Sequence, residues 1–226
     1  MDKKLFLVVL MASMAWWVGC SEGTIETAEQ DFGYDYFPLE VGNFREYRVL
    51  EVNFLAAGPD TSRYQLREEL TDSIVNGDQV VYTLERSVRP NAQEEWELDS
   101  VWTARITTTE AIQVENNIPI VKIAFPVLDG QIWDSNALNP NPDFPYASLF
   151  APSDSLDDNA LLVLIKDIPE NIVLKDERSE FYARGIGLVR RDFETLNFCT
   201  VDCDNRPEIT SGRILDQRLI AHGKVD

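Results

Sequence analysis

The sequence predicts an all-β protein: an antiparallel meander that forms an open or half barrel and carries a long loop rich in proline and asparagine. Stretches rich in β-branched and aromatic residues recur along the chain, and turn-forming residues separate them at short intervals. No stretch shows sustained helical periodicity. Consecutive strands joined by short connections pair antiparallel, and such a sheet protects its edges by curling, closing or being covered.

The first four expected strands span residues 44–55, 63–74, 79–88 and 96–108. Asn76-Gly77-Asp78 separates the second from the third, and an Asn-Gly pair readily adopts the positive φ angles of a tight hairpin. Six further strands are expected at residues 111–115, 118–127, 160–167, 172–182, 186–196 and 209–221.

Residues 129–159 interrupt this succession of strands and short turns and are expected to form a long loop. The segment contains four prolines (Pro140, Pro142, Pro145 and Pro152) and four aromatic residues (Trp133, Phe144, Tyr146 and Phe150). The aromatic residues predict that the loop packs on the barrel surface or across its mouth.

The N-terminus has the pattern of a lipoprotein signal peptide. Lys3 and Lys4 precede an apolar run, and this run reaches Cys20 before the roughly 20 apolar residues of a transmembrane helix are available. Cleavage before Cys20 divides the chain into a signal peptide (1–19), a lipidated cysteine with a flexible tether (20–34) and a single β domain (35–226). The alternative is an ordinary secretory peptide with an incidental cysteine.

Val18-Gly19-Cys20 resembles the lipobox of bacterial lipoproteins, although Trp17 stands where leucine is usual. The resemblance implies acylation of Cys20, palmitate included, and a membrane partner reached through the lipid. It places the domain in the cell envelope. Ser21 is compatible with sorting to the outer membrane, and whether the domain faces the periplasm or the outside stays open.

The chain is strongly acidic, with a net charge of -19. Removing the signal peptide takes away one net positive charge, which leaves about -20. Nucleic-acid binding is not expected, because it relies on clustered Lys and Arg that release counterions from phosphates. Attraction to anionic lipid head groups is disfavoured for the same reason. The acidity keeps an exported domain soluble.

Four short motifs occur in order along the chain: Tyr36-Phe37-Pro38-Leu39-x-Val41-Gly42-Asn43, Phe125-Pro126-Val127, Gly130-x-x-Trp133-Asp134 and Tyr182-Ala183-x-Gly185-Ile186-Gly187-Leu188-Val189. Together they resemble a family of uncharacterised Bacteroidota-type lipoproteins, from about Tyr36 to the C-terminus. The family has no established activity to transfer. Phe44 stands where tryptophan is common, and the segment 199–203 is a local addition without a family role.

Gly185-Ile186-Gly187 is expected to form a bend between two strands, because glycine tolerates conformations that other residues resist. A phosphate-binding loop is not supported, since no Lys-Ser or Lys-Thr pair follows and no helix begins there.

Cys199 and Cys203 are expected to form a small loop-closing disulfide, which an exported compartment permits. Zinc is the alternative, but only His222 could supply an imidazole ligand. A redox-active pair is less favoured, because the familiar spacing has two intervening residues. We expect no metal and no other cofactor. The acidic segment Asp154, Asp157, Asp158 and Asn159 could hold calcium, yet its spacing differs from an EF-hand loop.

No catalytic residue is identified. His222 is the single histidine and is expected to pack on a sheet face, since a general base would need a nucleophile and an orienting carboxylate. Trp96, Trp102 and Trp133 are the candidate ligand-contact aromatics, alongside core roles. Trp96 and Trp102 are six positions apart, so a regular strand would present both on one side.

The sequence therefore favours a non-enzymatic envelope module that binds a ligand or a partner protein. Two alternatives stay open. A half barrel could carry a lipid or acyl chain, by analogy of fold. An envelope glycan hydrolase would need two carboxylates in a cleft, one of them with a raised pKa.

Overall fold

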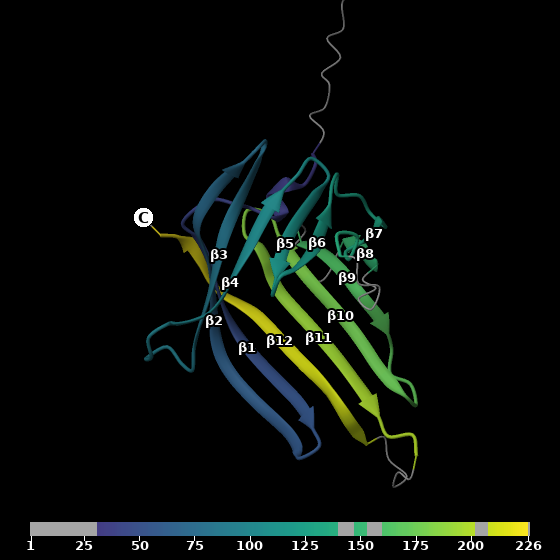
Figure 1. The fold of residues 1–226 in the computed structure, drawn as a ribbon. Coiled ribbons are helices and arrows are strands. Elements are labelled where there is room, and N and C mark those ends of the chain that lie inside the picture. The colour runs from purple at the N-terminus through teal and green to yellow at the C-terminus, as the bar shows by residue number, and fades with distance from the viewer. Residues whose placement is uncertain (1–30, 140–146, 153–159, 202–207, 226) are drawn as a thin grey trace, which may run out of the picture. The chain divides into compact units, whose positions relative to one another are not determined.

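Twelve strands and one short helix form the described part of the domain (Figure 1). The computed structural model describes residues 31–139, 147–152, 160–201 and 208–225, and these residues contain no α-helix. The elements are the 3-10 helix η1 (Tyr34–Tyr36) and the strands β1 (Asn43–Leu55), β2 (Gly58–Asn76), β3 (Gln79–Arg89), β4 (Glu97–Ile106), β5 (Glu110–Glu115), β6 (Ile118–Ala124), β7 (Ile132–Asp134), β8 (Ala147–Pro152), β9 (Ala160–Ile168), β10 (Leu174–Ala183), β11 (Gly187–Phe198) and β12 (Ile209–Lys224).

All twelve strands belong to one antiparallel sheet with the order β6-β5-β4-β3-β2-β1-β12-β11-β10-β9-β8-β7. Strands that are consecutive in sequence pair with each other, except for β6 and β7, and β1 also pairs with β12 at the centre of the sheet. The predicted all-β antiparallel meander is confirmed. The first and last strands of the chain therefore lie in the middle of the sheet, and β6 and β7 are its two edges.

The sheet curls until these two edges meet. The backbone N–H of Val121 on β6 donates to the carbonyl of Ser135, directly after β7, at 2.9 Å. The indole Nε1 of Trp133 on β7 donates to the carbonyl of Val121 at 3.1 Å. We call this junction between β6 and β7 the seam; a few contacts join the edges there, whereas a continuous ladder joins the other neighbouring strands. The predicted open barrel is confirmed.

The prediction of a long loop at residues 129–159 is wrong in part, because this segment contains β7 and β8. Ile132 pairs with Leu149, and Leu149 pairs with Leu164 on β9, so these short strands extend the sheet. Strands of three and six residues carry a weak sequence pattern, and the pairing of β8 with β9 and of β7 with β8 decides their conformation. Phe144 and Tyr146 lie outside the described residues, and Trp133 packs against the core.

The N-terminal segment fills one end of the barrel. Tyr36 and Phe37 belong to a buried cluster that also contains Phe125, Leu161 and Tyr182. The backbone N–H of Gly185 donates to the carbonyl of Asp35 at 2.8 Å, and that of Val127 donates to Phe32 at 3.0 Å. Residues 31–34, expected in the tether, are thus bound to the folded domain.

The hairpin of β2 and β3 projects beyond the sheet (Figure 1). On β2, pairing with β1 stops at Glu69, and on β3, pairing with β4 stops at Tyr82. Residues 72–81 consequently form a two-stranded ribbon that turns at Gly77, which has a φ of 66°. The Asn-Gly hairpin prediction is confirmed.

Candidate functional site

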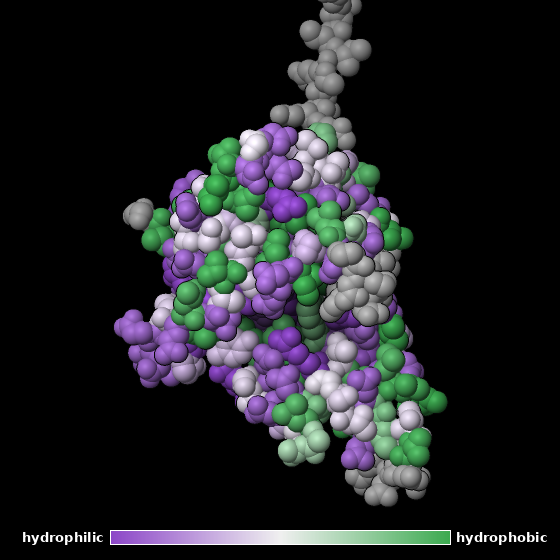
Figure 2. Space-filling view, in the orientation of Figure 1, coloured by the Kyte–Doolittle hydropathy of each residue, from purple (hydrophilic) through white to green (hydrophobic). Residues whose placement is uncertain are grey.

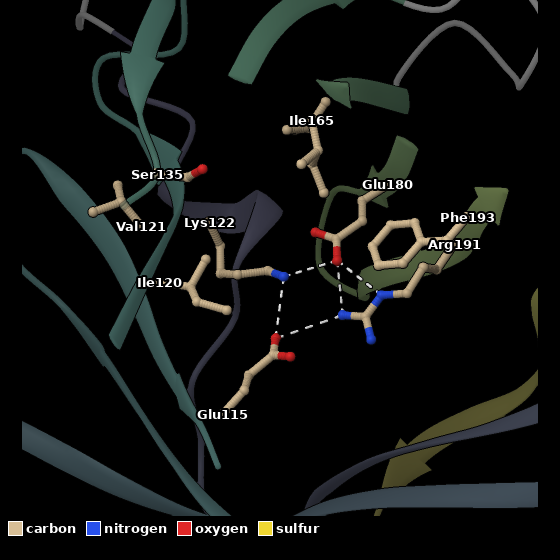
Figure 3. A pocket seen from close by; sticks show the side chains of 10 residues that line it. Glu115, Ile120, Val121, Lys122, Ser135, Ile165, Glu180, Arg191 and Phe193 are labelled. Carbon is tan, nitrogen blue, oxygen red and sulfur yellow. Dashed lines mark hydrogen bonds and ion pairs between the residues drawn. The ribbon is translucent and has the colours of Figure 1, made fainter. Parts of the chain in front are cut away.

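A cavity of about 110 Å³ lies inside the curled sheet, between β5 and β6 on one side and β9, β10 and β11 on the other (Figure 3). Part of its wall is charged and is formed by Glu115, Lys122, Glu180 and Arg191. The rest is mainly apolar and is formed by Ile120, Val121, Val163, Ile165 and Phe193, with Ser135. The cavity therefore offers both a polar and an apolar surface to a molecule inside it.

Glu180 is the centre of the charged wall. Its Oε1 accepts from Lys122 Nζ at 2.7 Å and from Arg191 Nε at 2.8 Å, and its Oε2 accepts from the Tyr182 hydroxyl at 2.6 Å. Glu115 completes a four-membered network, with its Oε1 3.2 Å from Lys122 Nζ and 3.7 Å from Arg191 Nη2. Two cations and two carboxylates balance each other in charge.

Strand register explains how these side chains come together. Glu180 lies opposite Arg191 in the β10–β11 ladder, and cross-strand partners share one face of a sheet. Lys122 reaches Glu180 from β6, at the other end of the sheet order. The side chains of Glu180 and Lys122 are only 1% and 5% exposed, so both ions are removed from water.

Electrostatics keep Glu180 ionised. Burial alone would raise its pKa, but Lys122 and Arg191 outweigh this effect and lower the pKa of Glu180 to about 2. Burial and the charge of Glu180 both raise the pKa of Tyr182, so its hydroxyl remains a hydrogen-bond donor. The arrangement therefore stabilises Glu180 as a fixed negative charge.

A second buried carboxylate has the same construction. Glu68 on β2 lies 3.2 Å from Arg86 Nε and 3.6 Å from Arg45 Nη2. Burial opposes ionisation, but the two guanidinium groups lower the pKa of Glu68. The Arg86 guanidinium also stacks on the Trp102 ring, 3.8 Å from its centroid. The barrel interior thus combines apolar packing with two ionic clusters.

The three candidate aromatics lie apart from this cavity. Trp102 is buried in a small cluster with Leu70 and Leu84, and Trp133 lies at the seam. Trp96 precedes β4 and is covered by the Arg89 guanidinium, 4.0 Å from its ring centroid. None of the three lines the cavity, and a ligand contact by any of them stays a prediction.

The remaining sequence-predicted residues are placed only in part. Cys20, Cys203 and the acidic segment 154–159 lie outside the described residues, so lipidation, the disulfide and calcium binding stay predictions. Cys199 follows β11, and its backbone N–H donates to the carbonyl of Glu208 at 2.8 Å, which links the end of β11 to the start of β12. His222 is exposed on β12 and is not packed in the sheet as expected. Among the described residues, no group of three His, Cys, Asp or Glu side chains could hold a metal.

Sequence reasoning did not single out Lys122, Glu180 or Arg191. A usable signal existed in β6, where Lys122 interrupts the apolar run Ile118-Pro-Ile-Val-Lys-Ile-Ala. A lysine in such a strand is rarely buried unless it is paired. Its partner could not be read from the sequence, because Glu180 is one of many carboxylates and lies 58 residues away.

Comparisons with known proteins give little further guidance. No protein-family description matches the chain, and no curated protein matches it. A solved structure from Bacteroides fragilis, of a protein assigned as exported and with a YmcC-like fold, is similar over 82% of this chain and 98% of its own. The identity is 13% and the TM-score is 0.40, values too low to transfer a fold or a function. Within the described part of the chain, no helix has the length and apolar character needed to cross a membrane.

Proposed function

We propose that this chain is a lipid-anchored protein of the cell envelope, held at the outer membrane through Cys20, whose β domain is a non-enzymatic module that binds a small ligand in the interior cavity. The observation that carries the proposal is the two-sided wall of this cavity, ionic at Lys122, Glu180 and Arg191 and apolar at Ile165 and Phe193. Such a site suits a small molecule with an apolar body and a polar head.

The size of the cavity bears on the lipid-carrier alternative. A volume of about 110 Å³ is well below the roughly 300–1,000 Å³ of sites that enclose drug-sized ligands. It is closer to engineered cavities of about 150 Å³ that admit benzene. A compact ligand fits without rearrangement, whereas an acyl chain requires the barrel to open.

The charge states bear on the glycan-hydrolase alternative. A glycosidase uses one carboxyl group with a raised pKa as general acid. The pKa of Glu180 is lowered to about 2, which is the opposite shift. This direction supports a binding role over acid–base chemistry at the cavity.

The solvent-facing surface is consistent with a tethered, soluble domain. Figure 2 shows hydrophilic and hydrophobic residues interspersed over the face in view. Interspersed side chains do not form the broad apolar patch that marks an obligate protein interface. On that face, the surface favours a ligand role over a permanent partner.

Native mass spectrometry of the mature lipoprotein, extracted from its own envelope in a mild detergent, tests the proposal. We expect a retained small molecule in addition to the lipid on Cys20. Ile165→Phe fills the apolar side of the cavity and should abolish retention, whereas Ile172→Phe, at a site 88% exposed, should not. Retention by Ile165→Phe would contradict the cavity as the site, and a retained diacyl lipid would favour the carrier alternative.

A further inference from the structure

Two segments singled out in the sequence analysis meet in a second pocket, of about 240 Å³. Pro38 and Asn43 come from the first motif, and Gly185 and Ile186 come from the bend between β10 and β11. The pocket lies where β1 begins and β12 ends. Backbone hydrogen bonds from Gly42 to the Leu70 carbonyl (2.7 Å) and from Val225 to the Gly42 carbonyl (2.9 Å) fix this part of the wall.

The pocket is basic in a strongly acidic chain. Arg45, His222 and Lys224 line it together with the amide of Asn43, and none of its ten lining residues is Asp or Glu. The whole sequence has 39 acidic residues against 20 Lys and Arg, so a surface chosen at random would contain carboxylates. The local composition is therefore the reverse of the overall one.

Strand register brings the basic groups together. Arg45 lies opposite His222, and Asn43 lies opposite Lys224, in the antiparallel β1–β12 ladder. Cross-strand partners lie on one face with their Cβ atoms about 5 Å apart, and residues two apart on a strand share that face. All four side chains consequently belong to one face of the strand pair.

Arg45 retains hydrogen-bonding capacity. Its Nη1 donates to the carbonyl of Ile186 at 3.3 Å, and its Nη2 lies 3.6 Å from Glu68. Glu68 is shared with Arg86, which is nearer at 3.2 Å, so the charge of Arg45 is incompletely offset. Arg45 Nε is buried and has no hydrogen bond to the described residues. The guanidinium therefore has donor capacity beyond its contacts with Ile186 and Glu68.

Gly187 makes room for this guanidinium. A Cβ atom at position 187 would overlap Arg45 Nη1, and the φ of 91° there is a conformation that glycine adopts readily. The glycine-containing bend thus holds Arg45 in place. Lys224 pairs with Glu40, but both side chains are at least half exposed, and an exposed pair of this kind is weak enough for an anion to share the lysine.

We infer that this pocket binds a phosphate group, free or carried by an organic molecule, between Arg45, His222 and Lys224. Guanidinium and ammonium groups bind phosphate oxygens through charge-assisted hydrogen bonds, and Asn43 adds a neutral donor. Phosphate carries about 1.5 to 2 negative charges at neutral pH, which matches the two cations Arg45 and Lys224 better than the single charge of a carboxylate does. This site is separate from the interior cavity and does not depend on the proposed function.

Titration of the mature lipoprotein in neutral detergent with inorganic phosphate tests the inference, with the amide NMR shifts of Gly185 and Gly223 as readout. We expect saturable binding. The double variant His222→Gln with Lys224→Gln should bind about tenfold more weakly or worse, because it removes two exposed charge-assisted contacts without disturbing the core. Arg213→Gln is the matched control, since Arg213 lies on the same strand with a similar exposure of 49% and should leave affinity unchanged.

Several outcomes would overturn the inference. These are the absence of saturable binding at millimolar phosphate, equal affinity in the double variant, or an equal loss in Arg213→Gln. Acetate binding tighter than phosphate would replace the phosphate assignment with a carboxylate. A soluble short-chain phosphatidic acid distinguishes the two sources of the phosphate group. Binding at least tenfold tighter than that of inorganic phosphate would identify a lipid headgroup, whereas equal affinities would identify free or small organic phosphate. Both outcomes support the site.

Discussion

Lys122 and Glu180 form a 2.7 Å ion pair across the interior of the barrel, although 58 residues separate them in sequence. Lys122 lies on an edge strand of the sheet and Glu180 lies three strands from the opposite edge. The pair therefore joins the two ends of the curled sheet from the inside, while Trp133 and Val121 join them along the seam.

Removing one member of this network should destabilise the protein strongly. Glu180→Gln leaves Lys122 and Arg191 buried with a single carboxylate, Glu115, and loss of one partner of a buried pair costs about 3–5 kcal/mol. Chemical denaturation would measure the free energy of unfolding. Glu177→Gln is the control, because the Glu177 side chain is 42% exposed and Lys175 keeps its second partner, Glu194, so the loss is at most about 1 kcal/mol. Equal effects of the two variants would contradict a structural role for the network.

Stability should fall at acid pH because of Glu180. Its pKa is about 2 in the folded protein and 4.5 ordinarily, so the unfolded chain binds the proton first. The resulting stabilisation is complete above about pH 4.5 and disappears as the pH falls toward 2, a change of about 3 kcal/mol for a shift of this size. Unfolding free energies measured between pH 7 and pH 3 should fall less steeply in Glu180→Gln than in the wild type. If the unfolding free energies of the variant and the wild type fall in parallel, carboxylates other than Glu180 dominate the loss of stability at acid pH.

Gly187→Ala should be more harmful than Gly185→Ala. Both glycines have positive φ angles, so each substitution incurs about 1–2 kcal/mol of backbone strain. Only at position 187 would the added methyl group overlap Arg45, whereas nothing lies within 4 Å at position 185. A lower melting temperature of Gly187→Ala measures this overlap together with the less favourable φ of 91° against 70°. If both melt together, Arg45 moves aside without loss.

The predicted Cys199–Cys203 disulfide should add little to global stability. A loop this short gives a stabilisation of about 2 kcal/mol in the chain-entropy treatment, and strain reduces it. The intact mass of the oxidised protein should be lower by two hydrogens, and reduction should restore them. The double variant Cys199→Ser with Cys203→Ser should keep the native circular dichroism spectrum. Free thiols in protein isolated without reductant would contradict the pairing.

Much of the fold was predictable because its signals are local. The Asn76-Gly77 turn, the β-branched and aromatic runs of β1 to β6 and the bend at Gly185 to Gly187 each depend on adjacent residues. The strands β7 and β8 were missed, because they are short and owe their conformation to pairing, β8 with β9 and β7 with β8.

The candidate site was less predictable because its signals are distributed. Lys122, Glu180 and Arg191 come from three strands, and only register and curl bring them together. Strand register also places His222 opposite Arg45, and the sequence around either residue does not indicate that the other is its neighbour. In this chain, local chemistry specifies the strands, while cross-strand geometry specifies the sites.

The pairing of β1 with β12 also has a consequence for folding kinetics. Asn43 lies opposite Lys224, so this central ladder has very high contact order, and closing so long a loop is entropically costly and slow. We expect β1 to β6 to form as a meander with an open edge on β1 while the C-terminal half is still being synthesised or exported. That edge stays unpaired until β12 arrives, which makes the partly exported chain, and not the finished barrel, the species most prone to aggregate.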